Sequence, residues 1–191
     1  MFAEICKKII ASQFLPLLIL TGCNQMSEMK QDSDAGMNGG FEITDSGLPV
    51  NWLCYTEKTV KDGEFTITSD REIFREGKQS LKFNVKSCSS TGGSLSPGMA
   101  QEFDAVPGAH YKLGFWIRNQ GSQFTVCAGP VSAFTGNVKS LIKSDQDFND
   151  WKYCEYIIDI PLDFGKLRIE LNVLKPGTFW IDDLTLEEIK G

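Results

Sequence analysis

The feature that most constrains the fold of this chain is a two-residue alternation of apolar and polar side chains. The segment Lys166–Val173 (KLRIELNV) has Leu, Ile, Leu and Val at every second position, with Arg, Glu and Asn between them. Tyr111–Asn119 and Ser80–Lys86 follow the same rule. Because successive side chains of a strand point to opposite faces, the pattern predicts half-buried strands of antiparallel sheets. Further strands are expected at 40–44, 64–69, 99–104, 123–128, 152–160 and 178–186.

Turn signals separate these strands, and no long amphipathic helix lies among them. Asp62-Gly63, Pro97-Gly98, Pro107-Gly108 and Pro176-Gly177 are dipeptides typical of turns. About nine short strands at this spacing predict an all-β fold, an antiparallel two-sheet β-sandwich or jelly roll. We expect this domain to span residues 38–191, a length sufficient to bury a core.

The first residues have a different character. Lys7 and Lys8 precede an apolar run, Ile9–Leu20, that is too short to span a bilayer, and this combination predicts an export signal over residues 1–22. The run ends in LTGC, which resembles the lipobox of bacterial lipoproteins. That resemblance implies cleavage before Cys23, lipid on its thiol, a tether over residues 23–37 and a place in the cell envelope. Asn24, rather than Asp, resembles the pattern of outer-membrane lipoproteins.

Four further cysteines lie in the expected domain: Cys54, Cys88, Cys127 and Cys154. An even number in an exported domain predicts two disulfides. A zinc site is the alternative, although no CxxC pair is present. Sequence alone allows three pairings, and we favour Cys127–Cys154 with Cys54–Cys88 because Cys127 and Cys154 lie in two late strands that could be neighbours.

Charge and motifs exclude several function classes. The net charge is −6 and no basic run follows the leader, which argues against a nucleic-acid partner. The chain has one histidine, His110, and lacks the GxSxG, HExxH and GxxxxGK[ST] motifs. We therefore predict that the protein is not an enzyme, a small β-sandwich polysaccharide lyase being the weaker alternative.

A set of landmarks then follows in a recognisable order. NGGFE, GLPVNW, EGKQSLKF, VPGAHYKLGFWIR, DWKYCEY and PGTFWIDDLTLE run from Asn38 to Glu187. This set resembles the carbohydrate-binding modules of families four, nine and twenty-two, within the galactose-binding-like jelly rolls. Members of such fold groups differ in ligand, because fold does not imply function.

The resemblance implies a structural calcium where the first and last strands meet. The acidic positions of FE and IDD correspond to Glu42, Asp182 and Asp183. Calcium takes six to eight hard oxygen ligands, so backbone carbonyls around Gly77–Gln79 would complete the shell. The alternative is that Asp182 and Asp183 face solvent at a strand edge and cap turns.

A sugar-binding groove needs exposed aromatic rings flanked by polar side chains. Gly114 leaves a gap on its strand that a ligand could approach, whereas Trp52 either stacks on a sugar or plugs the end of the core. Tyr55 carries less weight because it adjoins Cys54. The outward-facing candidates for glycan binding, with Trp52, are Trp116, Arg118, Tyr153, Arg168, Glu170 and Asn172.

Together these patterns predict a non-catalytic surface lipoprotein that binds polysaccharide through a jelly-roll module. Its membrane contact would be the lipid on Cys23. The alternative is a structural lipoprotein of the same fold whose partner is a cell-surface protein. Exposed aromatic and Arg side chains in a groove would favour the first, and a large flat apolar patch would favour the second.

Overall fold

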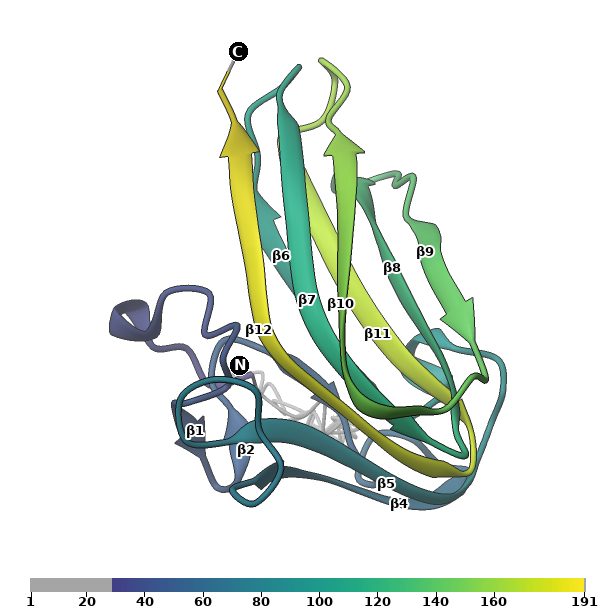
Figure 1. Ribbon diagram of the computed structural model, residues 1–191. Helices are drawn as coiled ribbons and strands as arrows, with labels where there is room; N and C mark the ends of the chain where they lie inside the picture. Colours follow the sequence, from purple (N-terminus) through teal and green to yellow (C-terminus); the bar gives the residue numbers. More distant parts are fainter. Residues whose placement is uncertain (1–28, 191) are drawn as a thin grey trace, which may run out of the picture.

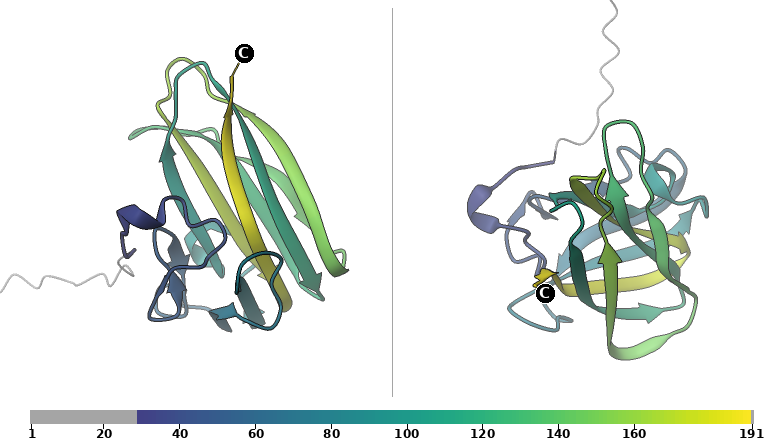
Figure 2. Two further views of the ribbon diagram at one scale, coloured as in Figure 1. Left: turned by 60° about the vertical axis from the view of Figure 1, so that its left-hand side comes forward. Right: turned by 90° about the horizontal axis from the view of Figure 1, so that it is seen from above.

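A computed structural model describes residues 29–190 as two stacked antiparallel sheets of five strands each (Figure 1). One sheet has the order β10-β7-β12-β5-β4 and is called the β7 sheet; the other has the order β3-β6-β11-β8-β9 and is called the β11 sheet. A separate ribbon pairs β1 with β2. Figure 2 shows the two sheets as distinct layers. The predicted fold class, an all-β two-sheet sandwich of the jelly-roll type, is confirmed.

Strand lengths range from two residues in β1 and β2 to thirteen in β12, and two short 3-10 turns accompany the strands. Their bounds are β1 Thr44–Asp45, β2 Leu48–Pro49, β3 Leu53–Tyr55, β4 Gly63–Asp70, β5 Ser80–Cys88, β6 Gly98–Asp104, β7 His110–Gln120, β8 Gln123–Val131, β9 Lys139–Ser144, β10 Phe148–Asp159, β11 Lys166–Lys175 and β12 Gly177–Ile189, with 3-10 turns at Ser33–Ala35 and Gly93–Leu95.

The core lies between the sheets and is built from the alternating residues that the sequence singled out. Leu167, Ile169 and Leu171 of β11 and Leu113 and Phe115 of β7 are buried. Burying a side chain of this size contributes about 1.5–3 kcal/mol relative to leaving it exposed. Because the period is two, the same strands present their other side chains on the outer faces, and this places the polar residues of β11 and β7 on opposite surfaces of the molecule.

Two parts of the strand prediction were wrong. The expected strand at 40–44 is irregular, and only Thr44 belongs to a strand, because Phe41 adopts a positive φ of 56° that lies outside the range of a regular strand. The short strands β3 and β9 were missed. β3 has three residues, and β9 is a polar edge strand with no buried residue.

The ground for our preferred cysteine pairing was also wrong. Cys127 lies on β8 of the β11 sheet, whereas Cys154 lies on β10 of the β7 sheet, so the two strands are not neighbours. Within residues 29–190, Cys88, Cys127 and Cys154 are free thiols. Cys54 is buried on β3. The structure thus gives no support to the expected disulfides.

The proposed signal, the predicted lipidation site Cys23 and the first part of the tether, residues 23–28, lie outside the described part of the chain. In the part that is described, no helix has the length and apolarity to cross a membrane. The predicted lipid anchor stays a prediction.

Candidate functional site

The outer face of the β11 sheet carries a polar centre on β11 and small residues beside it. In the strand register Arg168 lies opposite Glu102 of β6, and Glu170 lies opposite Ala100. On the other side of β11, Glu170 lies opposite Cys127 and Arg168 opposite Gly129 of β8. Since small side chains flank long ones, the face is hollowed rather than flat.

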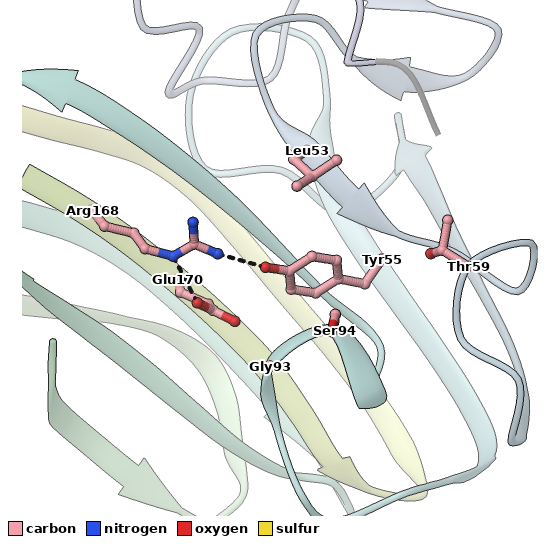
Figure 3. Close-up of a pocket in the computed structure, with 7 residues that line it drawn as sticks. All are labelled: Leu53, Tyr55, Thr59, Gly93, Ser94, Arg168 and Glu170. Atoms are coloured by element: carbon pink, nitrogen blue, oxygen red, sulfur yellow. Dashed lines mark hydrogen bonds and ion pairs between the residues drawn. The ribbon is translucent and has the colours of Figure 1, made fainter. Parts of the chain in front are cut away.

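The hollow has a volume of about 440 Å³, within the range of small-ligand sites. Figure 3 shows Arg168 and Glu170 projecting from β11 toward the ring of Tyr55 on β3. The loop after β3 and the Gly93–Leu95 turn form its walls, and its lining residues are Leu53, Tyr55, Thr59, Gly93, Ser94, Arg168 and Glu170.

Gly98 makes room for the only aromatic ring among these lining residues. A Cβ atom built at Gly98 would lie 3.1 Å from Cδ2 of Tyr55 and would collide with the Leu171 carbonyl and the Asn172 amide. The Tyr55 ring therefore lies close over the backbone of β6. Glycine in a strand interior often marks such a close approach.

Arg168 holds the polar groups of this face in place. Its Nε donates to Glu170 Oε2 at 2.9 Å, one terminal nitrogen donates to Glu102 Oε1 at 3.1 Å, and the other donates to the Tyr55 hydroxyl at 2.7 Å. A guanidinium has five N–H donors, so two remain for a ligand. The three contacts fix the side chain in one orientation, and this pre-organises the site.

Burial and the neighbouring charges determine the electrostatics here. Burial, with the nearby Glu170 carboxylate, raises the pKa of Tyr55 to about 12, although Arg168 opposes the shift. Tyr55 is thus a neutral hydroxyl at any physiological pH. Burial disfavours the charge on Arg168, but its hydrogen bonds to Glu170 and Glu102 outweigh this effect and raise its pKa.

Glu170 carries an unsatisfied acceptor. Its Oε2 binds Arg168, but its Oε1 is buried and accepts no hydrogen bond from any residue that the structure describes. A buried carboxylate oxygen without a donor is costly and leaves the negative charge of Glu170 poorly compensated. The groups of this centre that remain free to bind a ligand are the two N–H donors of Arg168, which suit the oxygen of a sugar hydroxyl.

Asn172 has a different role from the one the sequence predicted. Its side chain is 3% exposed, its Oδ1 accepts from the Gly93 N–H and its Nδ2 donates to the Gly93 carbonyl, both at 2.9 Å. Its amide is therefore occupied and unavailable to a ligand. Instead Asn172 pins the Gly93–Leu95 turn that forms one wall of the hollow.

The other predicted aromatic candidates lie on the opposite side of the molecule, on the outer face of the β7 sheet. Trp116 packs on Tyr153 with 5.1 Å between ring centroids, and the Arg75 guanidinium lies 4.4 Å from the Trp116 ring. Arg118 lies 5.6 Å from the ring of Trp180. The candidates that we grouped into one groove are thus divided between two faces, and no single ligand can contact both groups.

Two details of the predicted groove are corrected. Gly114 does not leave a gap, because a Cβ atom there would lie only 2.5 Å from the Tyr153 hydroxyl and 2.9 Å from Thr185 Oγ1. Trp52 is 2% exposed and its indole N–H donates to the carbonyls of Met37 and Asn38. It plugs the end of the core and is not a stacking platform.

The acidic residues at the junction of the first and last elements accept backbone hydrogen bonds. Asp182 is fully buried, and its Oδ2 accepts from the N–H groups of Arg75 at 2.7 Å and Glu76 at 3.2 Å. Glu42 Oε1 accepts from the N–H groups of Lys78 and Gln79 at 2.9 and 3.2 Å. Burial raises the pKa of Asp182, and its backbone hydrogen bonds oppose the shift.

These contacts do not fit the predicted calcium site. Among residues 29–190 no three His, Cys, Asp or Glu side chains gather as metal ligands. Calcium needs six to eight oxygens, whereas the partners of Glu42 and Asp182 are N–H donors. Asp183 adopts a positive φ of 48° at a register shift in β12, which is a β-bulge and not a second metal ligand in this arrangement. Calcium stays an untested prediction.

The site residues that sequence analysis missed are Glu102 and Leu53, and Tyr55 was undervalued. The signal for Leu53 and Tyr55 was present as a two-residue alternation around the buried Cys54, but three residues are too few to define a strand. Glu102 follows the same alternation within the predicted strand at 99–104.

No protein-family model matches the sequence. Among solved structures, the chain is similar in fold to the xylan-binding domain CBM22-1 of Xyn10C from Paenibacillus barcinonensis, with a TM-score of 0.58, 11% identity and coverage of 80% of this chain and 93% of that chain. It is also similar to a CBM4 structure, with a TM-score of 0.55, 12% identity and coverage of 80% and 98%.

One curated protein, alpha-L-arabinofuranosidase 1 of Arabidopsis thaliana, is 24% identical over 156 residues. The match covers 78% of this chain but only 23% of that protein's length, so the activity of the whole enzyme is not carried over. At these identities the likeness to solved structures establishes the fold. The chain has the two-sheet sandwich of the CBM22 and CBM4 carbohydrate-binding modules.

Proposed function

We propose that this domain is a non-catalytic carbohydrate-binding module, and that it takes a xylan-like polysaccharide into the hollow on the β11 sheet. The observation that carries the proposal is the arrangement of Tyr55, Arg168 and Glu170 around one cavity of about 440 Å³. The Tyr55 ring is 5% exposed and forms one wall of this cavity, while the Arg168 guanidinium and the Glu170 carboxylate complement the hydroxyl groups of a sugar.

Relatives support the same ligand class. The similar solved structure from Paenibacillus barcinonensis is a xylan-binding domain, and the curated relative is named for its action on arabinofuranosides. Both names point to pentose-containing polysaccharides. Several of the matched solved structures are xylan-binding modules, and another is the enzymatically active domain of a bacteriophage tailspike protein. The binding modules support a binding role for the present domain.

The test is a binding measurement on the purified protein against arabinoxylan, with Tyr55→Ala beside it. We expect retention on arabinoxylan gels that the substitution reduces at least tenfold, because the cavity loses one wall and Arg168 loses the hydroxyl that orients it. Trp116→Ala, on the opposite face, is the matched control and should bind normally. Absence of binding to arabinoxylan and to a wider polysaccharide panel would refute the proposal.

Display on a bacterial surface is a further part of the proposal. It is supported by the LTGC sequence that ends at Cys23 and by the apolar run before it. Expression in a bacterium fed labelled palmitate should label the wild-type chain and leave Cys23→Ser unlabelled. Labelling of both chains, or of neither, would contradict the lipid anchor and leave the glycan proposal intact.

One observation favours a protein partner as the second candidate. Phe134 is 99% exposed at the tip of the β8–β9 connection, and Ile157 is 55% exposed beside Leu141 in a cleft of about 270 Å³. Exposed apolar side chains of this size mark interaction sites in some proteins. Capture of an envelope protein that Phe134→Ser loses, together with no glycan binding, would favour this role.

A further inference from the structure

The charge pattern around the hollow carries an inference that rests on the proposed function and narrows its ligand. We propose that the site selects neutral glycans and discriminates against sugars that carry a carboxylate. A xylan chain substituted with arabinose is neutral, whereas one substituted with glucuronic acid is acidic, so the two differ in a property that this site can sense.

Carboxylates outnumber cations around Arg168, although Lys143 of β9 shares the outer face through its register partner Thr125. Arg168 is the only cation among the described residues that line the hollow, and it lies between Glu170 and Glu102. At the end of the strand Lys166 stands opposite Asp104, so this pair adds no net charge. The local balance is thus one positive charge against two negative charges, before any ligand binds.

The Arg168 guanidinium already donates hydrogen bonds to neighbouring side chains. Both carboxylates and the Tyr55 hydroxyl accept hydrogen bonds from Arg168, and the side chains of Arg168 and Glu170 are only 26% and 14% exposed. A ligand carboxylate at this position would be the third carboxylate to share the single positive charge of Arg168. Like charges held a few ångströms apart away from bulk water repel strongly.

The remaining binding groups suit hydroxyls better than anions. Glu170 Oε1 is buried and accepts no hydrogen bond from any residue that the structure describes, so its negative charge is poorly compensated. A ligand carboxylate held by the two free N–H groups of Arg168 would add a further negative charge beside it, whereas a sugar hydroxyl would not. The position of Glu170 therefore disfavours an acidic group.

The test compares two ligands that differ at one group, which is a carboxylate in one and a neutral primary alcohol in the other. Xylo-oligosaccharides carrying one glucuronic acid substituent are titrated into the purified protein by calorimetry, before and after chemical reduction of their carboxyl group. We expect the reduced ligand to bind at least tenfold more tightly at low ionic strength. The difference should shrink as salt is added, because the Debye length falls from about 30 Å at 0.01 M to about 10 Å at 0.1 M.

A matched pair of variants separates a local effect from the overall acidity of the chain. Glu102→Gln and Glu187→Gln each remove one negative charge, but Glu187 lies on β12 of the β7 sheet, 63% exposed in its ion pair with Lys112. Only Glu102→Gln should narrow the preference for the reduced ligand, by severalfold. Equal narrowing by both variants would show that net charge, and not this site, makes the selection.

The outcomes distinguish the inference from the function beneath it. If neither ligand binds and arabinoxylan fails as well, the proposed function is wrong. If both forms bind equally, or the acidic form binds more tightly through the two remaining N–H groups of Arg168, carbohydrate binding stands and the inference is overturned.

Discussion

The two outer faces of the sandwich carry the same kinds of side chain, but they differ in whether those side chains leave a cavity. On the β7 sheet, Trp116 is covered by Arg75 on one side and packs on Tyr153, which itself stays 44% exposed. On the β11 sheet, Tyr55 lies beside a hollow, and Arg168 points into it. One face is filled by its own side chains and the other leaves room.

The residues between the large side chains account for this difference. Ala100 of β6 and Cys127 of β8 flank the polar centre of β11, and neither reaches over it. On the β7 sheet the one small residue, Gly114, is already covered by the Tyr153 hydroxyl. The comparison teaches that an exposed aromatic or arginine indicates a binding face only when its neighbours on the same face are small.

The largest effect is expected from a matched pair of arginines. Arg168→Ala removes the two N–H donors that remain for a ligand, together with the three hydrogen bonds to Glu170, Glu102 and Tyr55. A hydrogen bond to a charged group contributes about 1.5–3 kcal/mol, so losing two such bonds to the ligand should lower arabinoxylan affinity at least 100-fold. Arg118→Ala, on the outer face of the β7 sheet (the filled face), should change the affinity for arabinoxylan less than twofold. Calorimetric titration of both variants gives the comparison, and similar losses in both would remove the distinction between the faces.

Acid should lower the stability of the protein by protonating Asp70, whose contacts lie on the β7 sheet. Asp70 is buried, which opposes its ionisation, but hydrogen bonds from Trp180 Nε1, the backbone N–H groups of Glu72 and Ile73, and Lys82 lower its pKa to about 2. Its folded pKa lies below the unfolded value, so the stabilisation is present above about pH 4 and is lost as pH falls through about 2. The loss amounts to about 2 kcal/mol.

Thermal unfolding between pH 5 and pH 2 measures this effect on the wild type and on Asp70→Asn. The variant should be less stable at pH 5 and should lose less stability on acidification. A parallel acid dependence in the two proteins would show that Asp70 does not anchor the filled face.

A matched pair of glycines tests the role of space directly. A methyl group at Gly98 would meet the Leu171 carbonyl and the Tyr55 ring, so Gly98→Ala should displace Tyr55 and weaken arabinoxylan binding about tenfold. At Gly114 the methyl group would meet the ends of Tyr153 and Thr185, which can rotate away. Gly114→Ala should therefore bind normally. If Gly98→Ala binds as the wild type does, the placement of Tyr55 over β6 is not required.

The smallest effect is expected from chelation. Asp182 and Glu42 satisfy their oxygens with backbone N–H groups, and this arrangement needs no cation. EDTA should leave the melting temperature unchanged in calorimetry, whereas Asp182→Ala should lower it. A fall in melting temperature with EDTA that calcium reverses would restore the metal site.

The alternation of the sequence predicted most of the fold, because it is a local property. It located β4 to β8 and β10 to β12, with Leu167 and Ile169 correctly directed to the core. It could not predict which strands share a sheet. Trp116 and Arg168 obey the same alternation, yet the strand pairing places them on opposite faces.

The environment of the acidic residues near the end of the chain could not be predicted for the same reason. Asp182 lies buried in a strand because backbone donors more than one hundred residues earlier, at Arg75 and Glu76, supply its partners. Such long-range pairing leaves no trace in the local sequence. The same holds for Asn172, whose partner at Gly93 lies on a distant turn.

The most direct test of the central claim is the affinity of arabinoxylan oligosaccharides for Tyr55→Ala and Trp116→Ala, measured side by side by calorimetry. The account predicts that Tyr55→Ala loses at least tenfold in affinity. It predicts that Trp116→Ala keeps its affinity but unfolds at a lower temperature, because a packed aromatic pair and a cation–π contact are lost. Loss of affinity in Trp116→Ala with normal binding by Tyr55→Ala would place the site on the β7 sheet and contradict the account.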